Sequence, residues 1–421
     1  MRLRVFAILP LMGGIASGQV SSYTISSFNL NLTNQSQSTY ISAFSGSGTA
    51  VFTGLPVTSA SVSVTGTNTR DRGLDCGDLV ELNMTISFSG TDTLSMLVTG
   101  PTSGDSSTVT LTTYVTGGTG AYANRGGAGT FTATQNGTVI TGTGAGMLTT
   151  GAPTPVPVIS PGGIVPLYGQ APLASPGSWI SIYGSNLAET VTRWNGDFPT
   201  QLGNVSVTID NKPAYLWYVS PGQINAQIPD DNTNGCVNVV VTTPNGAASG
   251  GITLQSAQPS FSLLNGKYAA GVIPAPNGGG AYGSGANSYD IVGPVGAFSY
   301  STRPVKVGET LVLYGVGFGP TNPPVPAGQV YSGASPITNQ VIVYIGGQQA
   351  PVAFAGLVGA GLYQLNVTVP RVSSGDQQIR ALLMGPAITP PLFSADMTQT
   401  CDDPDPGDTP PSNCAVYVTV Q

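Results

Sequence analysis

The chain has 421 residues and a formal net charge of −7, with 7% charged residues, 58 glycines and 34 prolines. It contains no histidine, which excludes a Ser-His-Asp triad, a Cys-His pair and a histidine-bearing zinc site within this chain. An acidic balance without a basic stripe argues against nucleic acid and anionic membranes as partners. Because 40% of the residues are hydrophobic and short β-branched runs alternate with Gly, Pro, Asn and Asp, we predict an all-β protein.

The N-terminal segment "MRLRVFAILPLMGGIASGQ" has the pattern of a signal peptide. Two arginines precede an apolar run over residues 5–15, and Ala16 and Gly18 supply the small residues of a cleavage site. We therefore predict that residues 1–18 are removed and that the protein is secreted or lies at the cell surface, where disulfides can form. A buried first strand or helix is the alternative. The apolar run is too short to span a bilayer, and we expect no transmembrane segment.

Residues 19–150 alternate apolar residues with Ser or Thr, and Gly separates the runs. This period of two predicts about eight strands, and hence an N-terminal β-barrel or β-sandwich. The string "GGTGAYANRGGAGTF" resembles a hairpin of calycin-like and allene-oxide-cyclase-like barrels, and no activity is carried over from it. Four prolines in residues 151–162 predict a semi-rigid linker.

The remaining chain contains a repeat. "QINAQIP" at residues 223–229 is echoed by "QLNVTVP" at residues 364–370. "PGSWISIYGSNLA" is echoed by "VGETLVLYGVGFG", and "VTIDNKPA" by "VYIGGQQA", in the same order. Order and spacing agree over three segments, so we predict a duplicated domain, with copies at residues 163–257 and 258–421.

Turn chemistry explains parts of the repeated pattern. Asp210-Asn211 and Gly346-Gly347 fit two-residue hairpin turns. In each copy a strand ends at Tyr-Gly, where the chain must turn sharply. For Asn225 and Asn366 we expect a structural role, in which each side chain bonds backbone groups at a corner; a shared ligand-binding role is the alternative.

The strings "PLASPGSWISIYGSNLA", "SPGQINAQIP", "RPVKVGETLVLYGVGFGPTNPPVPAGQV" and "YQLNVTVP" resemble a C-terminal domain family of secreted acidobacterial proteins, over about residues 160–421. The strands around "SVTIDNKPA" also resemble IPT/TIG domains, which are immunoglobulin-like (Ig-like). The resemblance implies two tandem Ig-like β-sandwiches after a variable N-terminal region. It implies no reaction and no cofactor.

The segment "CDDPDPGDTPPSNC" brackets an acidic loop with Cys401 and Cys414. In a secreted chain this arrangement predicts a disulfide that closes the loop. Its carboxylates are oxygen ligands of the kind that Ca²⁺ takes, but the spacing does not match an EF-hand loop. A solvated acidic loop is our interpretation, and a calcium site is the alternative. The candidate calcium ligands are Asp402, Asp403, Asp405 and Asp408.

The sequence does not decide how two further cysteines are paired, and one cluster of charged residues needs an interpretation. Cys76 and Cys236 lie in different predicted domains, so a bridge between them would require close contact, and free or intermolecular thiols are the alternatives. Cys76 belongs to "RDRGLDCGDLVE", the densest charge cluster. A carboxylate-pair hydrolase would need two acids held in a cleft, and we interpret this cluster as a surface turn.

Aromatic residues concentrate in the first copy of the repeat. Trp179 and Trp217 lie in strand-like segments, so we expect both in the core. Trp194 is flanked by polar loop residues, and we predict that it is exposed and contacts a ligand.

The leading functional hypothesis is a non-catalytic extracellular protein that acts in adhesion, surface structure or partner binding through Ig-like modules. Its partner would be a protein or a glycan at the cell surface. The first alternative is a carbohydrate-binding protein. The second is an enzyme with a histidine-free site in the N-terminal barrel. A pocket converging on carboxylates would favour the enzyme, exposed aromatics would favour glycan binding, and open sheet edges would favour assembly.

Overall fold

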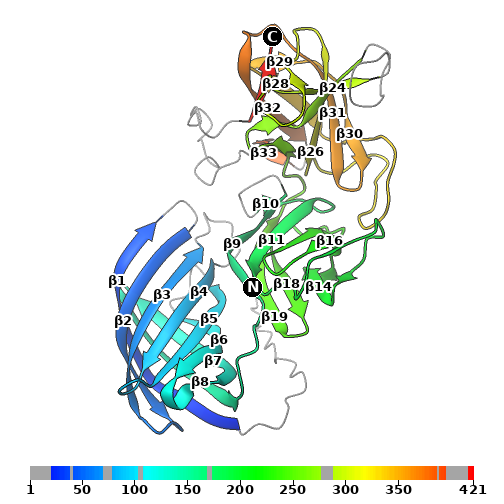
Figure 1. Cartoon of the computed structure of the whole chain (residues 1–421). Coiled ribbons are helices and arrows are strands. Elements are labelled where there is room, and N and C mark those ends of the chain that lie inside the picture. Colours follow the sequence, from blue (N-terminus) through cyan, green and yellow to red (C-terminus); the bar gives the residue numbers. More distant parts are fainter. Residues whose placement is uncertain are drawn as a thin grey trace.

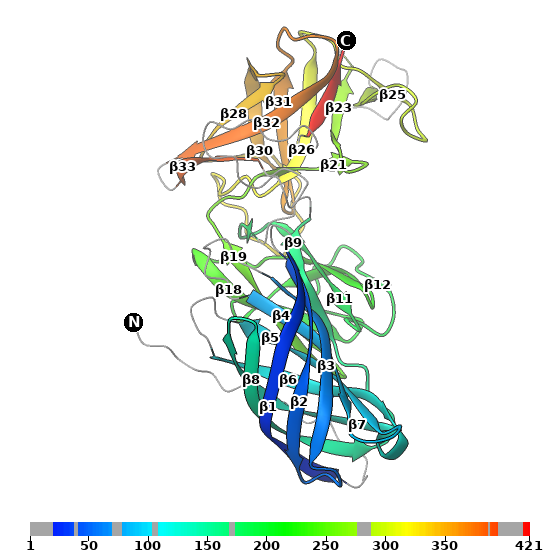
Figure 2. The ribbon, with the colours of Figure 1, turned by 90° about the vertical axis from the view of Figure 1, so that its left-hand side faces the viewer.

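The computed structural model describes residues 20–37, 41–69, 78–102, 108–167, 173–275, 288–385, 388–394 and 416–421. The predicted signal peptide lies outside these residues. Within them the protein is all-β, with an N-terminal barrel followed by two Ig-like sandwiches, which confirms the predicted fold class. No helix of the described part is long and apolar enough to cross a membrane. Two views show the barrel at one end, the second sandwich at the other and the first sandwich between them (Figures 1 and 2).

Eight antiparallel strands form the barrel in sequence order, and β1 pairs with β8 to close it. Hydroxyl groups meet across neighbouring strands on its outer wall, as between Thr110 Oγ1 and Thr132 Oγ1 at 3.2 Å. The strands are β1 (Val20–Gln37), β2 (Ile41–Thr53), β3 (Ser59–Thr69), β4 (Asp78–Ser87), β5 (Thr93–Thr102), β6 (Thr108–Thr119), β7 (Arg125–Asn136) and β8 (Val139–Thr150), with a short 3₁₀ turn at Gly120–Tyr122.

The barrel interior is filled by apolar side chains, and this explains the glycines of β8. Phe131 is 2% exposed, and its ring meets Phe28 edge to face with centroids 4.9 Å apart. A Cβ added at Gly142 would lie 2.7 Å from the Phe131 ring. A Cβ added at Gly146 would lie 2.5 Å from the Tyr23 hydroxyl. Inward-facing glycines of β8 therefore leave the space that these rings occupy.

The first sandwich has one sheet in the order β10-β19-β18-β14-β13, with β15 paired to β14, and a second sheet in the order β12-β16-β17-β11-β9. Ile180 and Ile182 of β11 are fully buried in the core, and Trp179 and Tyr183 alternate with them on the outer face. Strand β9 begins at Val158, inside the predicted linker. The strands are β9 (Val158–Pro166), β10 (Leu173–Ala174), β11 (Trp179–Ser185), β12 (Thr192–Arg193), β13 (Gln201–Leu202), β14 (Val205–Ile209), β15 (Lys212–Pro213), β16 (Tyr215–Val219), β17 (Gln223–Gln227), β18 (Gly235–Thr243) and β19 (Gly246–Leu254).

The second sandwich has one sheet in the order β25-β24-β23-β26-β31-β30-β27, with β20 paired to β26, and another in the order β21-β22-β34-β32-β28-β29, with β33 paired to β32. Its core includes Phe261 and Phe318, whose ring centroids are 6.0 Å apart. The strands are β20 (Ser260–Phe261), β21 (Leu263–Leu264), β22 (Tyr268–Ala269), β23 (Gly271–Pro274), β24 (Tyr289–Val292), β25 (Thr302–Arg303), β26 (Thr310–Val316), β27 (Ser335–Pro336), β28 (Gln340–Ile345), β29 (Gln348–Ala350), β30 (Val352–Gly359), β31 (Leu362–Thr368), β32 (Gly375–Gly385), β33 (Ile388–Phe393) and β34 (Tyr417–Val420).

The repeated strings occupy equivalent places in the two sandwiches. Tyr183 of β11 lies opposite Gln223 of β17, and Tyr314 of β26 lies opposite Gln364 of β31. The following strands agree as well, because β16 pairs with β17 as β30 pairs with β31, and β14 pairs with β18 as β28 pairs with β32. The matching register explains why the two strings resemble each other.

The two predicted hairpin turns have the backbone that their residues favour. Asp210 and Asn211 have φ values of 50° and 61°, and Gly346 and Gly347 have φ values of 56° and 75°. Positive φ at both central residues is the mark of a type I′ turn, whose twist matches that of the flanking strands. Asp, Asn and Gly are the residues that tolerate this conformation most readily.

Candidate functional site

All three tryptophans of the chain gather on the sheet β12-β16-β17-β11-β9 of the first sandwich. The Trp179 ring of β11 meets Trp194 and Trp217 edge to face, with ring centroids 5.6 and 5.8 Å away. The Phe198 ring lies 4.6 Å from the Trp194 ring. Edge-to-face contacts of this kind hold aromatic rings in fixed orientations. We call these four residues the tryptophan cluster.

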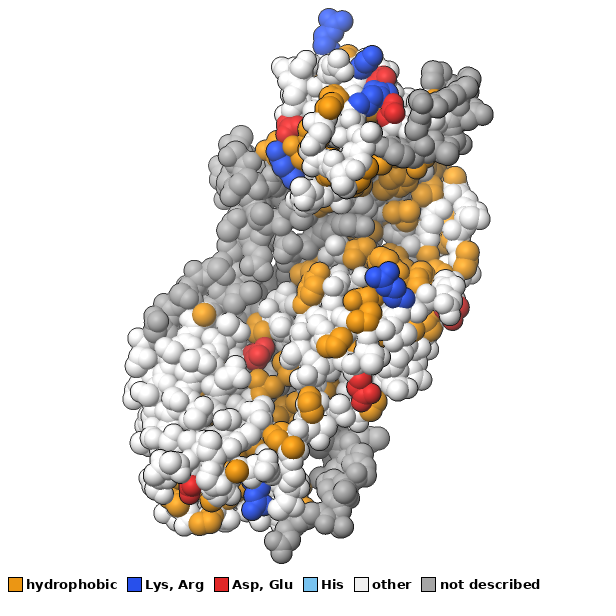
Figure 3. All heavy atoms as spheres, viewed as in Figure 1, with side chains coloured by type: hydrophobic (Ala, Val, Ile, Leu, Met, Phe, Trp, Pro, Cys, Tyr) orange, Lys and Arg blue, Asp and Glu red, His pale blue; other side chains and the backbone are white. Residues whose placement is uncertain are grey.

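Exposure within the cluster differs from the sequence prediction. Trp179 is 7% exposed, but it is buried on the outer face of β11 rather than in the sandwich core. Trp217 is 37% exposed, so the prediction that it is buried is wrong. The register of β16 against β17 shifts between Leu216 and Tyr218, so Trp217 lies in a bulge and points outward. Trp194 is half-buried rather than fully exposed, because it packs against Phe198 and Trp179. Figure 3 shows hydrophobic side chains gathered over this part of the molecule, while the barrel surface is mostly neutral and polar.

Amide side chains form a second feature of the same face. Gln223 Nε2 donates to Asn225 Oδ1 at 2.8 Å, and Ser181 Oγ donates to the same oxygen at 3.1 Å. In the second sandwich Gln364 Nε2 donates to Asn366 Oδ1 at 2.8 Å. The expectation that the two asparagines bond backbone groups is therefore wrong. Each accepts a bond from the glutamine two positions earlier, because residues i and i+2 of a strand lie on one face.

The second sandwich contacts this face directly. Trp179 Nε1 donates to the Ala360 carbonyl oxygen at 2.8 Å. The Gly328 amide donates to Gln227 Oε1 at 3.0 Å, and the Ala327 amide lies 3.1 Å from a carboxylate oxygen of Asp230. These contacts come from the loop between β26 and β27 and from the turn between β30 and β31. We call this region the junction.

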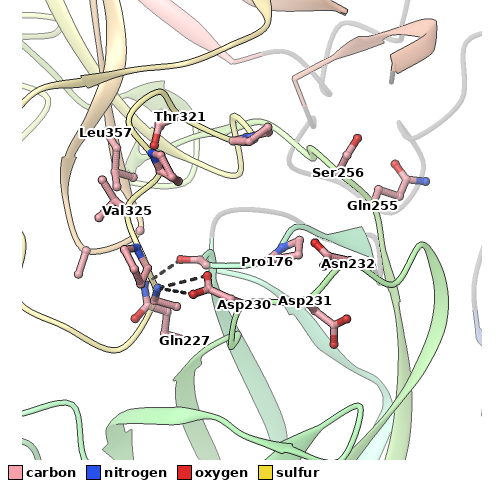
Figure 4. A pocket seen from close by; sticks show the side chains of 18 of the residues that line it. Pro176, Gln227, Asp230, Asp231, Asn232, Gln255, Ser256, Thr321, Val325 and Leu357 are labelled. Atoms are coloured by element: carbon pink, nitrogen blue, oxygen red, sulfur yellow. Dashed lines mark hydrogen bonds between the residues drawn. The ribbon is translucent and has the colours of Figure 1, made fainter. Parts of the chain in front are cut away.

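The junction contains a cavity of about 500 Å³, a volume typical of small-molecule sites. One wall is apolar and comes from the second sandwich, with Val325 and Leu357 among its residues. The opposite wall is polar and includes Asn232, Gln255 and Ser256 from the first sandwich and the segment after it (Figure 4). Sequence reasoning missed this cavity, because its walls come from segments far apart in the chain.

Charges at the junction are paired. Lys212 Nζ lies 3.1 Å from Asp231 Oδ2, and the Asp231 side chain is 3% exposed. Burial raises the pKa of Asp231, but hydrogen bonds from Thr233 and Lys212 and the charge of Lys212 outweigh burial and hold this pKa below its usual value. Asp231 therefore stays ionised at neutral pH, and its charge is compensated by the neighbouring ammonium group.

Catalytic and metal-binding candidates in the described part are few. No group of three or more His, Cys, Asp or Glu residues is placed there to hold a metal ion. In the described barrel Thr113 is the buried polar residue, at 3% exposure. Glu81 is half-buried on the outer wall, and burial raises its pKa. Closure of a filled barrel thus places its described carboxylates on the outside rather than around an interior cleft.

Several predicted sites lie outside the described residues. They include Cys76, Cys401 and Cys414, so the predicted Cys401–Cys414 disulfide stays a prediction. Cys236, at the start of β18, is not a free thiol. The acidic loop with the candidate calcium ligands Asp402, Asp403, Asp405 and Asp408 also lies outside the described part.

One comparison, with protein-family models, agrees with an Ig-like first sandwich. A search of curated proteins finds no match. A solved structure of Bacteroides ovatus SGBP-B, from a mixed-linkage glucan utilization locus and in complex with a mixed-linkage heptasaccharide, matches at 12% identity with a TM-score of 0.28. The match covers 79% of this chain and 64% of that one, which is less than two thirds of its length. Residues 163–256 match the IPT/TIG domain family.

Proposed function

We propose that this chain is a non-catalytic binding protein of the cell exterior and that its tryptophan cluster contacts the ligand. The observation that carries the proposal is the 37% exposure of Trp217 beside the half-buried Trp194. Rigid aromatic rings present a large contact area at a low cost in conformational entropy. The signal-peptide pattern of residues 1–18 supports the exterior location.

A glycan is the ligand class that this surface fits best. A sugar ring has an apolar face that can lie on an indole and a rim of hydroxyl groups that needs hydrogen-bond partners. The Arg193 guanidinium lies 5.6 Å from the centre of the Tyr218 ring, on strands that pair next to the cluster. Its donors therefore border the exposed rings and can bond hydroxyl groups. A protein partner at the same surface is the competing outcome.

Assembly through sheet edges has less support. The strands at the ends of the sheets include β12, β25 and β27, each of two residues, whereas the longer end strand β9 contacts β3 and β4 of the barrel. Very short edge strands offer few unpaired backbone groups, so they resist the addition of a strand from another chain. We therefore favour binding by side chains over adhesion by strand pairing.

We also propose that residues 163–257 and 258–421 are diverged copies of one module. The IPT/TIG match covers the first copy, and the shared strand register supports a common origin for the second.

The test is binding of the secreted chain to an array of immobilised glycans, with the Trp194→Ala/Trp217→Ala double variant alongside. Loss of two stacking contacts should weaken binding by about tenfold or more. Tyr300→Ala is the matched control, because Tyr300 is 38% exposed on the second sandwich. Wild-type chain that binds no glycan would overturn the glycan assignment. Equal binding by the double variant would overturn the proposed surface.

A further inference from the structure

The junction cavity has two unlike walls. The loop between β26 and β27 supplies Pro320, Pro324, Val325 and Pro326, and Leu357 of β30 adds to this apolar side. Rigid proline rings and branched side chains give a surface that changes little on contact. Figure 4 shows Val325 and Leu357 on one side of the space. An apolar ligand face can therefore be held there without reordering the protein.

The facing wall carries uncharged polar side chains. Asn232 and Asn234 lie in the loop between β17 and β18, and Gln255 and Ser256 lie directly after β19. Within the described part these four side chains take part in no hydrogen bond of the protein. Amide and hydroxyl groups both donate and accept. This wall therefore suits ligand hydroxyl groups, which can likewise donate and accept hydrogen bonds.

The charges of the cavity lining disfavour anionic ligands. The Asp230 carboxylate faces the Ala327 amide at 3.1 Å, and Asp231 pairs with Lys212. The one cation of the cavity wall is thus engaged, and the two carboxylates leave the lining slightly acidic. An anionic ligand would lose its hydration without gaining a free cation.

We propose that the junction cavity is a second binding site, and that it takes a neutral, hydroxyl-rich ring such as one or two sugar units. The apolar face of the ring packs on the wall of prolines, Val325 and Leu357, and its hydroxyl groups bond Asn232, Gln255 and Ser256. The ligand touches both sandwiches, so its binding stabilises their contact. This site does not depend on the exposed tryptophans, and its failure leaves the proposed function intact.

The test is saturation-transfer NMR and calorimetry on the full secreted chain, with glucose, xylobiose, cellobiose and maltose as neutral probes. Glucuronate is the charged probe, and an oligoproline peptide tests for a protein ligand. We expect at least one neutral sugar to bind, and Asn232→Ala/Gln255→Ala to weaken it by at least tenfold. In a Trp217→Ala background, Asn232→Ala/Gln255→Ala should still weaken the remaining sugar binding by at least tenfold, which separates the cavity from the tryptophan cluster. Gln201→Ala, an exposed amide on β13, is the matched control.

A second variant tests the cavity without removing its polar side chains. Val325→Phe adds volume at the apolar wall, where Val325 is half-buried, and should abolish binding while leaving both exposed asparagines in place. Three results would overturn the proposal: no neutral sugar binds, sugar binding survives both cavity variants, or glucuronate or oligoproline binds more tightly than every neutral sugar.

Discussion

Replacement of Gly328 by alanine should separate the two sandwiches. Gly328 has a φ of 76°, and an added Cβ would lie 2.0 Å from a ring carbon of Tyr215. Carbon atoms in contact are normally about 3.5–4.0 Å apart, so the loop or the ring must move by about 1.5 Å. Tyr215 packs against Phe198 of the tryptophan cluster, with centroids 6.5 Å apart, which limits how far the ring can yield.

The cost follows from the bonds that such a shift breaks. Gly328 donates to Gln227, and Ala327 donates to the charged Asp230. A neutral hydrogen bond contributes about 0.5–1.5 kcal/mol and one to a charged group about 1.5–3 kcal/mol. We therefore expect the junction to lose about 2–4.5 kcal/mol. Alanine in the left-handed region adds about 1–2 kcal/mol, which any such glycine replacement incurs.

Gly296→Ala isolates the second cost. Gly296 also has a φ of 76°, and no atom lies within 4 Å of an added Cβ. The control therefore carries the backbone strain without the collision. Both variants replace a glycine by alanine, and both positions lie in loops of the second sandwich.

Tryptophan fluorescence is the direct assay, because all three tryptophans lie in the cluster beside the junction. Trp179 is 7% exposed and donates its indole N–H to Ala360, so separation of the sandwiches exposes it. Gly328→Ala should shift the emission to the red and increase quenching by acrylamide, while far-ultraviolet circular dichroism stays unchanged. Gly296→Ala should match the wild type. If Gly328→Ala also matches the wild type, the contact at Tyr215 does not hold the sandwiches together.

Two further predictions concern hydrogen bonds between polar side chains, first those of Asn225 and Asn366 and then those of Asp376. Asn225→Ala leaves the buried Ser181 Oγ, in a residue 1% exposed, without its acceptor and should lower the free energy of unfolding in urea by about 1–3 kcal/mol. Asn366→Ala removes one half-buried hydrogen bond and should lower it by about 0.5–1.5 kcal/mol. Equal losses in the two variants would contradict this reasoning. Burial raises the pKa of Asp376, but hydrogen bonds led by that from Lys267 outweigh it and lower this pKa. Because the folded pKa lies below the unfolded one, the stabilisation is present above the ordinary carboxyl pKa and is lost as pH falls through the lowered value. In Asp376→Asn the melting temperature should therefore fall less than in the wild type as the pH is lowered from about 6 to about 2. The same pH dependence in both proteins would contradict a stabilising role of the ionised Asp376.

Local patterns account for the parts of the fold that sequence reasoning predicted. Alternation of apolar and hydroxyl residues gave the barrel strands, and the positive-φ residues of both hairpins were identified from their chemistry. The repeated strings predicted a duplicated domain, and Tyr183 and Tyr314 lie at equivalent register positions of the two sandwiches. These features depend on neighbours in sequence or on self-similarity, so one chain is enough to reveal them.

The site required information that no local pattern holds. Trp217 was expected in the core because its segment alternates like a strand, and the bulge that turns it outward arises from pairing with β17. The junction brings Asn232 and Gln255 opposite Val325, a wall that forms only when the sandwiches meet. The sequence around Gly328 does not indicate that a glycine is needed there, because the side chain that leaves no room for a Cβ is Tyr215, more than a hundred positions earlier.

The difference between the two repeated strings explains where the junction formed. Trp179 lies opposite Gln227 in the first sandwich, and both side chains bond the second sandwich. The pair at the equivalent register positions of the second sandwich is Thr310 and Thr368. Threonine is too short to reach a neighbouring domain as an indole or a glutamine amide does. Long side chains at these two register positions of the first sandwich therefore help to form the junction beside the tryptophan cluster.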